Sequence, residues 1–207
     1  MAIFLSNTMS DSIIQEVLGD SWSVLDNVIR RHYFLRPFSD DYICVSGEMS
    51  EIYHSSVAKL FIPFAMLLGA VVPYRANNVP TDVHCASSKE NANIYWDRVF
   101  KFTEKNHYHF KSHMEHVRDN EVIEFVRFGV GMRLKVTAEN GAIVFRGAGY
   151  IWRLFDVDIP VPIGLFFGNA YVEETPIDEN NFRMKMTIEH RLFGVMFRYE
   201  GTFNFGV

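Results

Sequence analysis

Four histidines within ten residues form the densest group of potential metal ligands in the chain: His107, His109, His113 and His116. On a strand the first three share one face, because side chains alternate with a period of two. His109 and His113 would then lie about 13 Å apart along the strand, which is too far for both to bind one ion. We therefore predict no metal site here, and an exposed polar face instead.

Motifs for nucleophilic and nucleotide chemistry are absent from the sequence. There is no GxSxG segment, and neither cysteine, Cys44 or Cys85, lies at a catalytic spacing from a histidine. Gly147 and Gly149, in RGAGY, are typical of a bulge in a bent strand rather than of a phosphate-binding loop. We predict no cofactor. The two cysteines indicate free thiols in a reducing compartment, with a single disulfide as the alternative.

Two charged residues occur where the alternation calls for apolar side chains. Arg98 shares its face with Trp96 and Phe100, and Glu124 lies between two valines in the segment EVIEFV. A charge on an inner face must be paired or must serve a ligand. One interpretation is that the two pair across the sheet, or that a bulge reverses the local parity. The other is that they form a polar anchor in an aromatic cavity, which would orient an apolar ligand.

The elements that would position these residues are strands. Apolar and polar residues alternate strictly through segments 182–190 and 195–205, and Asn140-Gly141 is a strong hairpin signal. We predict an α+β fold in one domain, residues 1–207. A large, curved antiparallel meander, about residues 79–205, would pack on helices in the N-terminal third, about residues 10–73. A stronger form of this expectation is a partly closed barrel around an apolar cavity.

Helical spacing and a long apolar run mark the N-terminal third. The run Leu60–Val72 has about thirteen residues and contains Pro63, so it is too short to span a bilayer. We predict a buried helix there, with membrane contact as a minor alternative. The other elements expected before residue 79 are helices at Ser10–Val17 (capped by Ser10 or Asp11) and Ser23–Tyr33, a short strand at Tyr42–Val45, and a helix starting at Ser50 or Ser55.

The composition favours an apolar interior. The 207 residues include 19 Phe, 9 Tyr and 3 Trp, enough rings to fill a thick core or line a pocket. A net charge of −5 argues against a nucleic-acid partner, which would require a basic face. The first ten residues lack the basic and apolar regions of a signal peptide, so we expect a cytoplasmic protein.

Inward parity on neighbouring strands predicts one common interior that could hold a ligand. Arg98 and Glu124 would supply its charged groups, and His190 is a weaker candidate of the same type. The apolar and aromatic residues predicted to face this interior are Trp96, Phe100, Phe110, Met184, Met186, Phe197 and Tyr199.

Several segments together resemble a bacterial family known only as domain of unknown function 4166. They are VLGDSWSVLDNVIRRHY (17–33), YWDRVFKF (95–102), FKS (110–112), EVIEFVRFGVGMRLKV (121–136), IPVPIGL (159–165) and LFGVMFRYEGTF (192–203). The resemblance carries no assigned activity. It implies that Arg98, Glu124, Tyr199 and the cluster Arg30-Arg31-His32 are the residues to study first. Similar proteins are often joined to an NAD(P)-binding domain like that of saccharopine dehydrogenases, which implies an NAD(P)-binding partner protein.

Three functions compete on these grounds. The first is a binding module that encloses a lipid or other hydrophobic small molecule. The second is a metal-independent enzyme in the same cavity, with Glu124 as general base and Arg98 stabilising an anion. The third is an accessory domain that docks on a redox or membrane partner through the Leu60–Val72 run or the loop Asp158–Gly168. Whether the protein is an enzyme is left open by the sequence.

Overall fold

The computed structural model describes residues 11–206, in which more residues lie in strands than in helices, and the helices are short. The strands are β1 (Tyr42–His54), β2 (Val79–Ala86), β3 (Ile94–Lys101), β4 (His107–Arg118), β5 (Glu121–Phe125), β6 (Val130–Glu139), β7 (Ala142–Leu154), β8 (Val157–Val161), β9 (Asn169–Pro176), β10 (Asn181–His190) and β11 (Gly194–Asn204). The helices are α1 (Ile13–Leu18), α2 (Asn27–Tyr33), α3 (Ile62–Leu67) and α4 (Gly164–Phe167), with 3₁₀ turns η1 (Gly19–Val24), η2 (Ala58–Leu60) and η3 (Arg127–Gly129).

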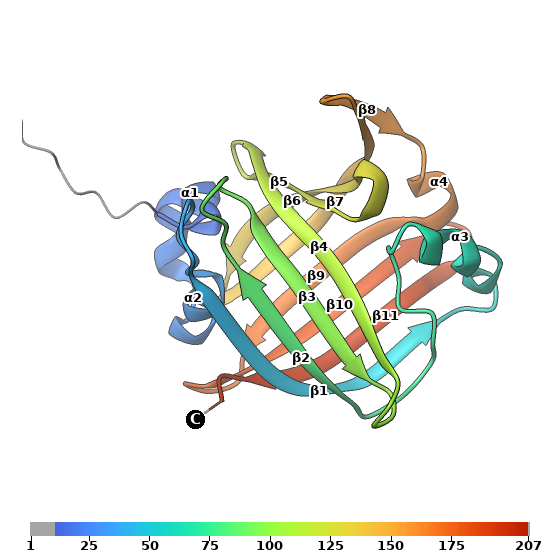
Figure 1. The fold of residues 1–207 in the computed structure, drawn as a ribbon, viewed down its shortest axis with the longest axis horizontal. Coiled ribbons are helices and arrows are strands. Elements are labelled where there is room, and N and C mark those ends of the chain that lie inside the picture. The colour runs from blue at the N-terminus through green and yellow to red at the C-terminus, as the bar shows by residue number, and fades with distance from the viewer. Residues whose placement is uncertain (1–10, 207) are drawn as a thin grey trace, which may run out of the picture.

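Within the described residues, ten strands form a closed antiparallel barrel (Figure 1). Strands β2 to β7 follow one another as a meander, and β9, β10 and β11 continue it after β7. The ring closes because β1 pairs with β2 on one side and with β11 on the other. Strand β8 is additional and pairs with the second half of β7. The predicted curved antiparallel sheet is confirmed, and it closes into a barrel.

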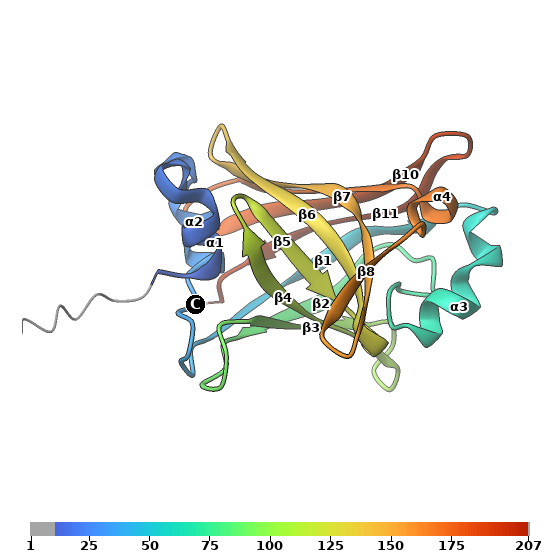
Figure 2. The ribbon, with the colours of Figure 1, turned by 90° about the horizontal axis from the view of Figure 1, so that it is seen from above.

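The two ends of the barrel are covered differently (Figure 2). Helices α1 and α2 lie at one end, and they bury Ile13, Ile14, Val28 and Ile29 against the strands. Helices α3 and α4 lie at the other end, where Ala65 is the buried residue of α3 and α4 buries none. The N-terminal helices therefore plug their end, whereas α3 and α4 cover the opposite end loosely.

The N-terminal helices begin later than their periodicity predicted. Ser12 caps α1 by accepting a hydrogen bond from the Gln15 amide, at 3.2 Å, so Asp11 is not the cap; Ser10 lies outside the described residues. Asp26 caps α2 in the same way through the amide of Val28. Each short polar side chain replaces a hydrogen bond that the first helical turn cannot make internally.

The predicted short strand at Tyr42–Val45 is the start of strand β1, which is longer than expected and makes the N-terminal third less helical than predicted. Strand β1 runs for 13 residues, through the position at Ser50 where a helix was expected to start. A bulge between Met49 and Glu51 changes the pairing register, so that Met49 and Ile52 are both buried although their spacing is odd. This break in parity hides the strand from an alternation pattern.

The apolar run Leu60–Val72 is not the buried helix that was predicted. It contains the end of η2, the six-residue α3 and an irregular segment, and Leu60, Phe64 and Leu67 are exposed. The predicted loop Asp158–Gly168 contains part of β8 and the single turn of α4. Among residues 11–206, no helix has the length and apolar content needed to cross a membrane.

Glycines act at the turn and at the seam that close the barrel. Asn140 and Gly141 both have positive φ, 51° and 86°, which confirms the predicted tight hairpin between β6 and β7. Gly47 of β1 and Gly201 of β11 face the partner strand's backbone so closely that a Cβ atom on Gly47 would overlap the carbonyl oxygen of Thr202. The β1–β11 seam therefore requires residues without side chains at these points.

Candidate functional site

A pocket of about 190 Å³ extends through the barrel interior, from the end of α2 to α3 and α4. Aromatic, aliphatic and methionine side chains make up most of its lining. Eight of the nine residues predicted for a common interior line it: Trp96, Arg98, Phe100, Phe110, Glu124, Met184, Met186 and Tyr199. The ninth, Phe197, is buried but lies outside the lining, and its ring packs against Phe167 with centroids 6.1 Å apart.

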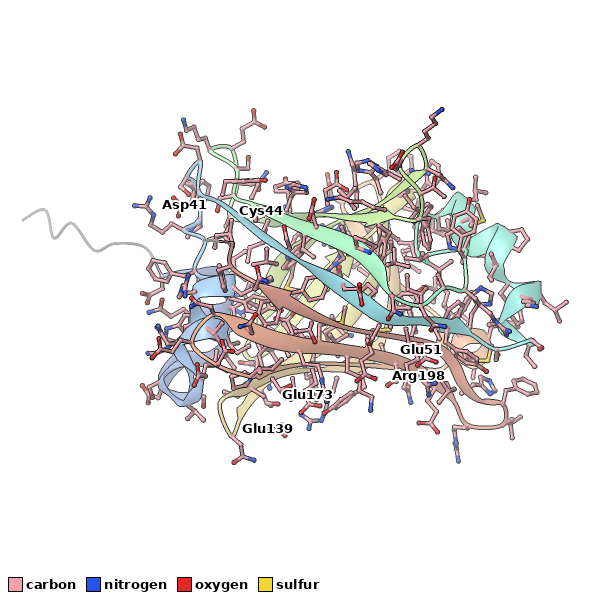
Figure 3. All side chains as sticks on the ribbon, turned by 90° about the horizontal axis from the view of Figure 1, so that it is seen from below. Asp41, Cys44, Glu51, Glu139, Glu173 and Arg198 are labelled. Carbon is pink, nitrogen blue, oxygen red and sulfur yellow. The ribbon has the colours of Figure 1, made fainter. Side chains whose placement is uncertain are left out.

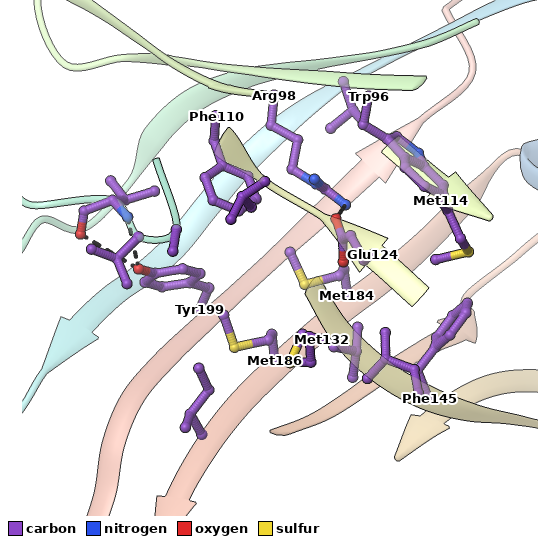
Figure 4. Close-up of a pocket in the computed structure, with 18 of the residues that line it drawn as sticks. Trp96, Arg98, Phe110, Met114, Glu124, Met132, Phe145, Met184, Met186 and Tyr199 are labelled. Carbon is purple, nitrogen blue, oxygen red and sulfur yellow. Dashed lines mark hydrogen bonds and ion pairs between the residues drawn. The ribbon is translucent and has the colours of Figure 1, made fainter. Parts of the chain in front are cut away.

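Arg98 and Glu124 contact each other inside the barrel, which is one of the two arrangements that their parity allowed (Figure 4). Nη2 of Arg98 lies 3.1 Å from Oε1 of Glu124. Ser112 joins them: Nη1 of Arg98 donates to Ser112 Oγ at 2.9 Å, and this hydroxyl donates to Glu124 Oε1 at 2.6 Å. The three residues come from β3, β4 and β5, so the contact ties three neighbouring strands together.

Aromatic rings stabilise the guanidinium of Arg98 from two sides. Its Cζ atom lies 5.3 Å from the ring centroids of both Trp96 and Phe110. A cation over a ring face is attracted by the ring quadrupole, and the attraction is stronger where water is scarce. Arg98 is therefore satisfied by one carboxylate, one hydroxyl and two rings, which fixes its position in the pocket wall.

Two tyrosines fasten the segment that follows α3 to the strands. The amide of Val72 donates to Tyr199 Oη at 3.0 Å, and the Tyr108 hydroxyl donates to the carbonyl oxygen of Val71 at 2.7 Å. Burial raises the pKa of both phenols, so they stay neutral donors and acceptors at physiological pH. Tyr199 thus serves mainly to hold the pocket wall together.

A second polar group lines the pocket near α2, and it consists of His32, Tyr33 and Glu174. Burial raises the pKa of Glu174 to about 7, although Tyr33 and Arg98 oppose this shift. Burial, and then the charge of Arg98, lower the pKa of His32 to about 3. At neutral pH the imidazole is therefore uncharged and Glu174 is only partly ionised.

Cys85 lies beside this polar group. Its Sγ atom is 3.9 Å from Nε2 of His32, and burial raises the pKa of its thiol to about 12. A thiol that keeps its proton is a poor nucleophile, so the contact with His32 does not create a catalytic pair. Cys44 and Cys85 are both free, and no disulfide joins them.

The four clustered histidines do not form a metal site. His109 Nδ1 lies 2.9 Å from Asp97 Oδ2, and His113 Nε2 lies 3.2 Å from Glu115 Oε1. Nowhere in residues 11–206 do three or more ligand-type side chains form a group that could hold a metal ion.

Other predicted residues hold the fold at places outside the pocket. His190 accepts the Leu192 amide on Nδ1, so its Nε2–H donates to the Leu165 carbonyl, at 2.9 Å, and links α4 to the β10–β11 turn. Arg31 lies over the ring of Phe205 at 4.3 Å. From the cluster Arg30-Arg31-His32, only His32 lines the pocket.

Glu174 was missed by sequence reasoning. It lies in the segment YVEETP, where Glu173 and Glu174 follow each other and either could have faced inward. Pairing of Glu174 with Met184 on β10 settles which one does, because Met184 also lines the pocket. An inward parity extended from the predicted face of β10 would have found it.

We expect the single substitution Arg98→Met to lower the free energy of unfolding by roughly 3 kcal/mol, because it leaves the Glu124 carboxylate inside the barrel without a cation. The double variant Arg98→Met/Glu124→Leu should recover most of this loss. Urea denaturation measures both. A double variant that is as unstable as the single one would contradict the pairing.

The matched control is Arg198→Met. Arg198 also pairs with a glutamate, Glu51, at 2.6 Å, but on the outer surface between β1 and β11 (Figure 3). Water screens that pair, so its loss should cost less than about 1 kcal/mol.

Glu174 and His32 should also make the free energy of unfolding depend on pH, in opposite directions. Folding raises the pKa of the Glu174 carboxyl from 4.5 to about 7, so the folded protein holds a proton more tightly than the unfolded chain does. This contribution to the free energy of unfolding is lost as the pH rises from 4.5 to about 7. Glu174→Gln should therefore gain stability relative to the wild type by roughly 3 kcal/mol between pH 4.5 and 7. His32 is neutral when folded, so His32→Gln should gain relative to the wild type as the pH falls from 6.5 toward 3.

Unfolding free energies from denaturant titrations at a series of pH values test both variants. A difference between Glu174→Gln and the wild type that does not change with pH would show that Glu174 titrates normally and is not desolvated.

The segments that resembled a known family meet at this pocket, since they supply His32, Trp96, Arg98, Glu124 and Tyr199 to its wall. A family model described as a domain of unknown function (DUF4166) matches residues 25–203. No curated protein and no solved structure that was compared with the chain matches it. The match spans the barrel from the start of α2 to the last strand, and the chain belongs to the DUF4166 family.

Proposed function

We propose that the barrel binds one small, largely apolar molecule in its interior. The observation that carries this proposal is the pocket itself: it lies within the barrel and is lined mostly by apolar side chains. Barrel diameter grows with strand number, and eight strands leave an interior that side chains can just fill or that holds one small ligand. A wider barrel has room for side chains and for a ligand.

The volume limits the size of that molecule. At about 190 Å³ the pocket is larger than the cavity of about 150 Å³ that holds a benzene molecule, and smaller than the roughly 300 Å³ of typical drug-sized sites. A ligand of about eight to ten non-hydrogen atoms, or one end of a longer chain, would fit. This size favours a short-chain or single-ring compound over a large lipid enclosed whole.

The enzyme hypothesis receives less support. A general base needs a carboxylate that is free to accept a proton from a substrate. Oε1 of Glu124 receives both the Ser112 hydroxyl and the Arg98 guanidinium, so a substrate would have to compete with them or use Oε2 alone. We therefore do not assign Glu124 a catalytic role.

We propose that the ligand enters at the end covered by α3 and α4. Phe64 and Leu68, in and next to α3, and Phe167 of α4 line the pocket there. Both helices are short, and Leu60, Phe64 and Leu165 expose more than half of their surface. Phe61 contacts Phe167, with ring centroids 5.4 Å apart, and this contact joins the two covering segments.

Native mass spectrometry of the protein purified from its own host should detect a retained small molecule. Val172→Phe should reduce this retention at least tenfold, because Val172 lines the pocket and a larger side chain would fill it. Val117→Phe is the matched control, since Val117 lies on β4 and is exposed. Retention that is equal in both variants would place the bound molecule outside the barrel, and a wild-type protein with no adduct would count against the proposal.

Phe61→Ala should speed the uptake and release of a small, neutral fluorescent probe such as naphthalene several-fold, because the contact between the α3 and α4 segments is lost. Stopped-flow fluorescence measures both rates. The control Leu60→Ala removes a side chain that is 79% exposed and should leave the rates unchanged. Identical rates in all three proteins would place the entrance elsewhere.

A further inference from the structure

Two polar atoms of the pocket wall have no hydrogen-bond partner among the described residues: Nδ1 of His32 and Oε2 of Glu174. Only 3% of the His32 surface and 7% of the Glu174 surface are exposed. Buried polar atoms in folded proteins are nearly always paired, because an unpaired one loses its hydration without compensation. Two such atoms on residues of one pocket favour a polar group on the molecule that binds there.

The other buried polar atoms without a hydrogen-bond partner lie away from the pocket, which distinguishes His32 and Glu174 from them. Further buried side-chain atoms without partners belong to Gln15, Arg30, His54 and Ser87, and none of these residues lines the pocket. His32 and Glu174 come from α2 and β9, elements far apart in sequence, yet both residues line the same pocket. A single group bound there could contact both.

We infer, building on the binding function proposed above, that this end of the pocket seats the hydroxyl group of a neutral, otherwise apolar alcohol, with Glu174 and His32 as its hydrogen-bond partners. The alkyl or ring portion then extends past Met184 and Met186 toward α3 and α4. The ligand class is an aliphatic or alicyclic alcohol.

A hydroxyl fits these partners better than a group that only donates or only accepts. Glu174 Oε2 requires a donor when the carboxylate is ionised. His32 faces the Cys85 thiol with Nε2, so Nδ1 is an acceptor in one tautomer and a donor in the other. A hydroxyl donates one hydrogen and accepts through two lone pairs. When Nδ1 of His32 carries the proton, the hydroxyl accepts from Nδ1 and donates to the ionised Glu174. When Nδ1 is an acceptor, the hydroxyl donates to Nδ1 and accepts from the protonated Glu174 carboxyl.

A charged head group fits poorly, because the titratable residues of this region are themselves pushed toward neutrality. The guanidinium of Arg98 is already paired with Glu124, so a carboxylate ligand would add a negative charge beside Glu174 without a free cation. Burial and the charge of Arg98 keep His32 uncharged, and they would likewise disfavour a buried ammonium group. The ionisable side chains that line the pocket are His32, Tyr33, Arg98, Glu124, Tyr150, Glu174 and Tyr199.

Four probes of similar size test the inference by isothermal titration calorimetry at pH 7.5: 1-octanol, its isomer heptyl methyl ether, octanoate and octylammonium. The ether accepts hydrogen bonds but cannot donate one. We expect 1-octanol to bind at least tenfold more tightly than each of the other three, because it alone is neutral and donates a hydrogen bond. This comparison uses the wild-type protein and does not depend on any variant being folded.

A substitution assigns the effect to the residue. Glu174→Leu should remove the tenfold preference for 1-octanol over the ether while both still bind. Glu173→Leu is the matched control on the same strand, because Glu173 points outward (Figure 3) and does not line the pocket; it should keep the preference.

The outcomes separate the two proposals. Ether binding as tight as octanol binding, or tighter binding of octanoate or octylammonium, would overturn the alcohol subsite and leave the binding function standing. Failure of all four probes to bind would overturn both. A preference that survives Glu174→Leu would show that the hydroxyl sits elsewhere in the pocket.

Discussion

Closure of the sheet is the constraint on which the rest of this structure depends. Strand β1 must pair with β2 and β11 at once, and only then do all barrel strands have two neighbours. Closure removes exposed strand edges within the ring and fixes its circumference. The interior volume follows from that circumference, and the helices at the two ends decide how much of it water can reach. A glycine at each side of the β1–β11 seam lets the strands approach closely enough.

Polar groups in the interior are divided between those that are satisfied and those that are not. The Arg98, Ser112 and Glu124 side chains satisfy one another and connect three strands. His32 and Glu174 keep one unpaired atom each. In the first group each charge has a partner, whereas the unpaired atoms of the second group lower stability when no ligand is bound.

Sequence patterns predicted the parts of the fold in which local periodicity and tertiary structure agree. Alternation identified β10 and β11, and it placed Arg98 and Glu124 on the inner face, where they contact each other. The pattern failed at β1, because the bulge near Ser50 shifts the parity within one strand. The face that α2 turns toward the barrel could not be predicted from the sequence either. His32 lines the pocket only because α2 covers that end of the barrel, and this position of α2 depends on the closed topology.

The order of the strands along the chain has a consequence for how the protein is made. Ser46 pairs with Asn204 and His54 with Phe197, so the seam joins segments separated by about 150 residues. At ribosomal rates of about 5 to 20 residues per second, about 8 to 30 seconds pass between the synthesis of β1 and that of β11. During this interval β1 has an open edge, which neighbouring nascent chains or chaperones can meet first. Its outward-facing Glu48 and Glu51 place negative charge along that edge, which opposes its association with other strands.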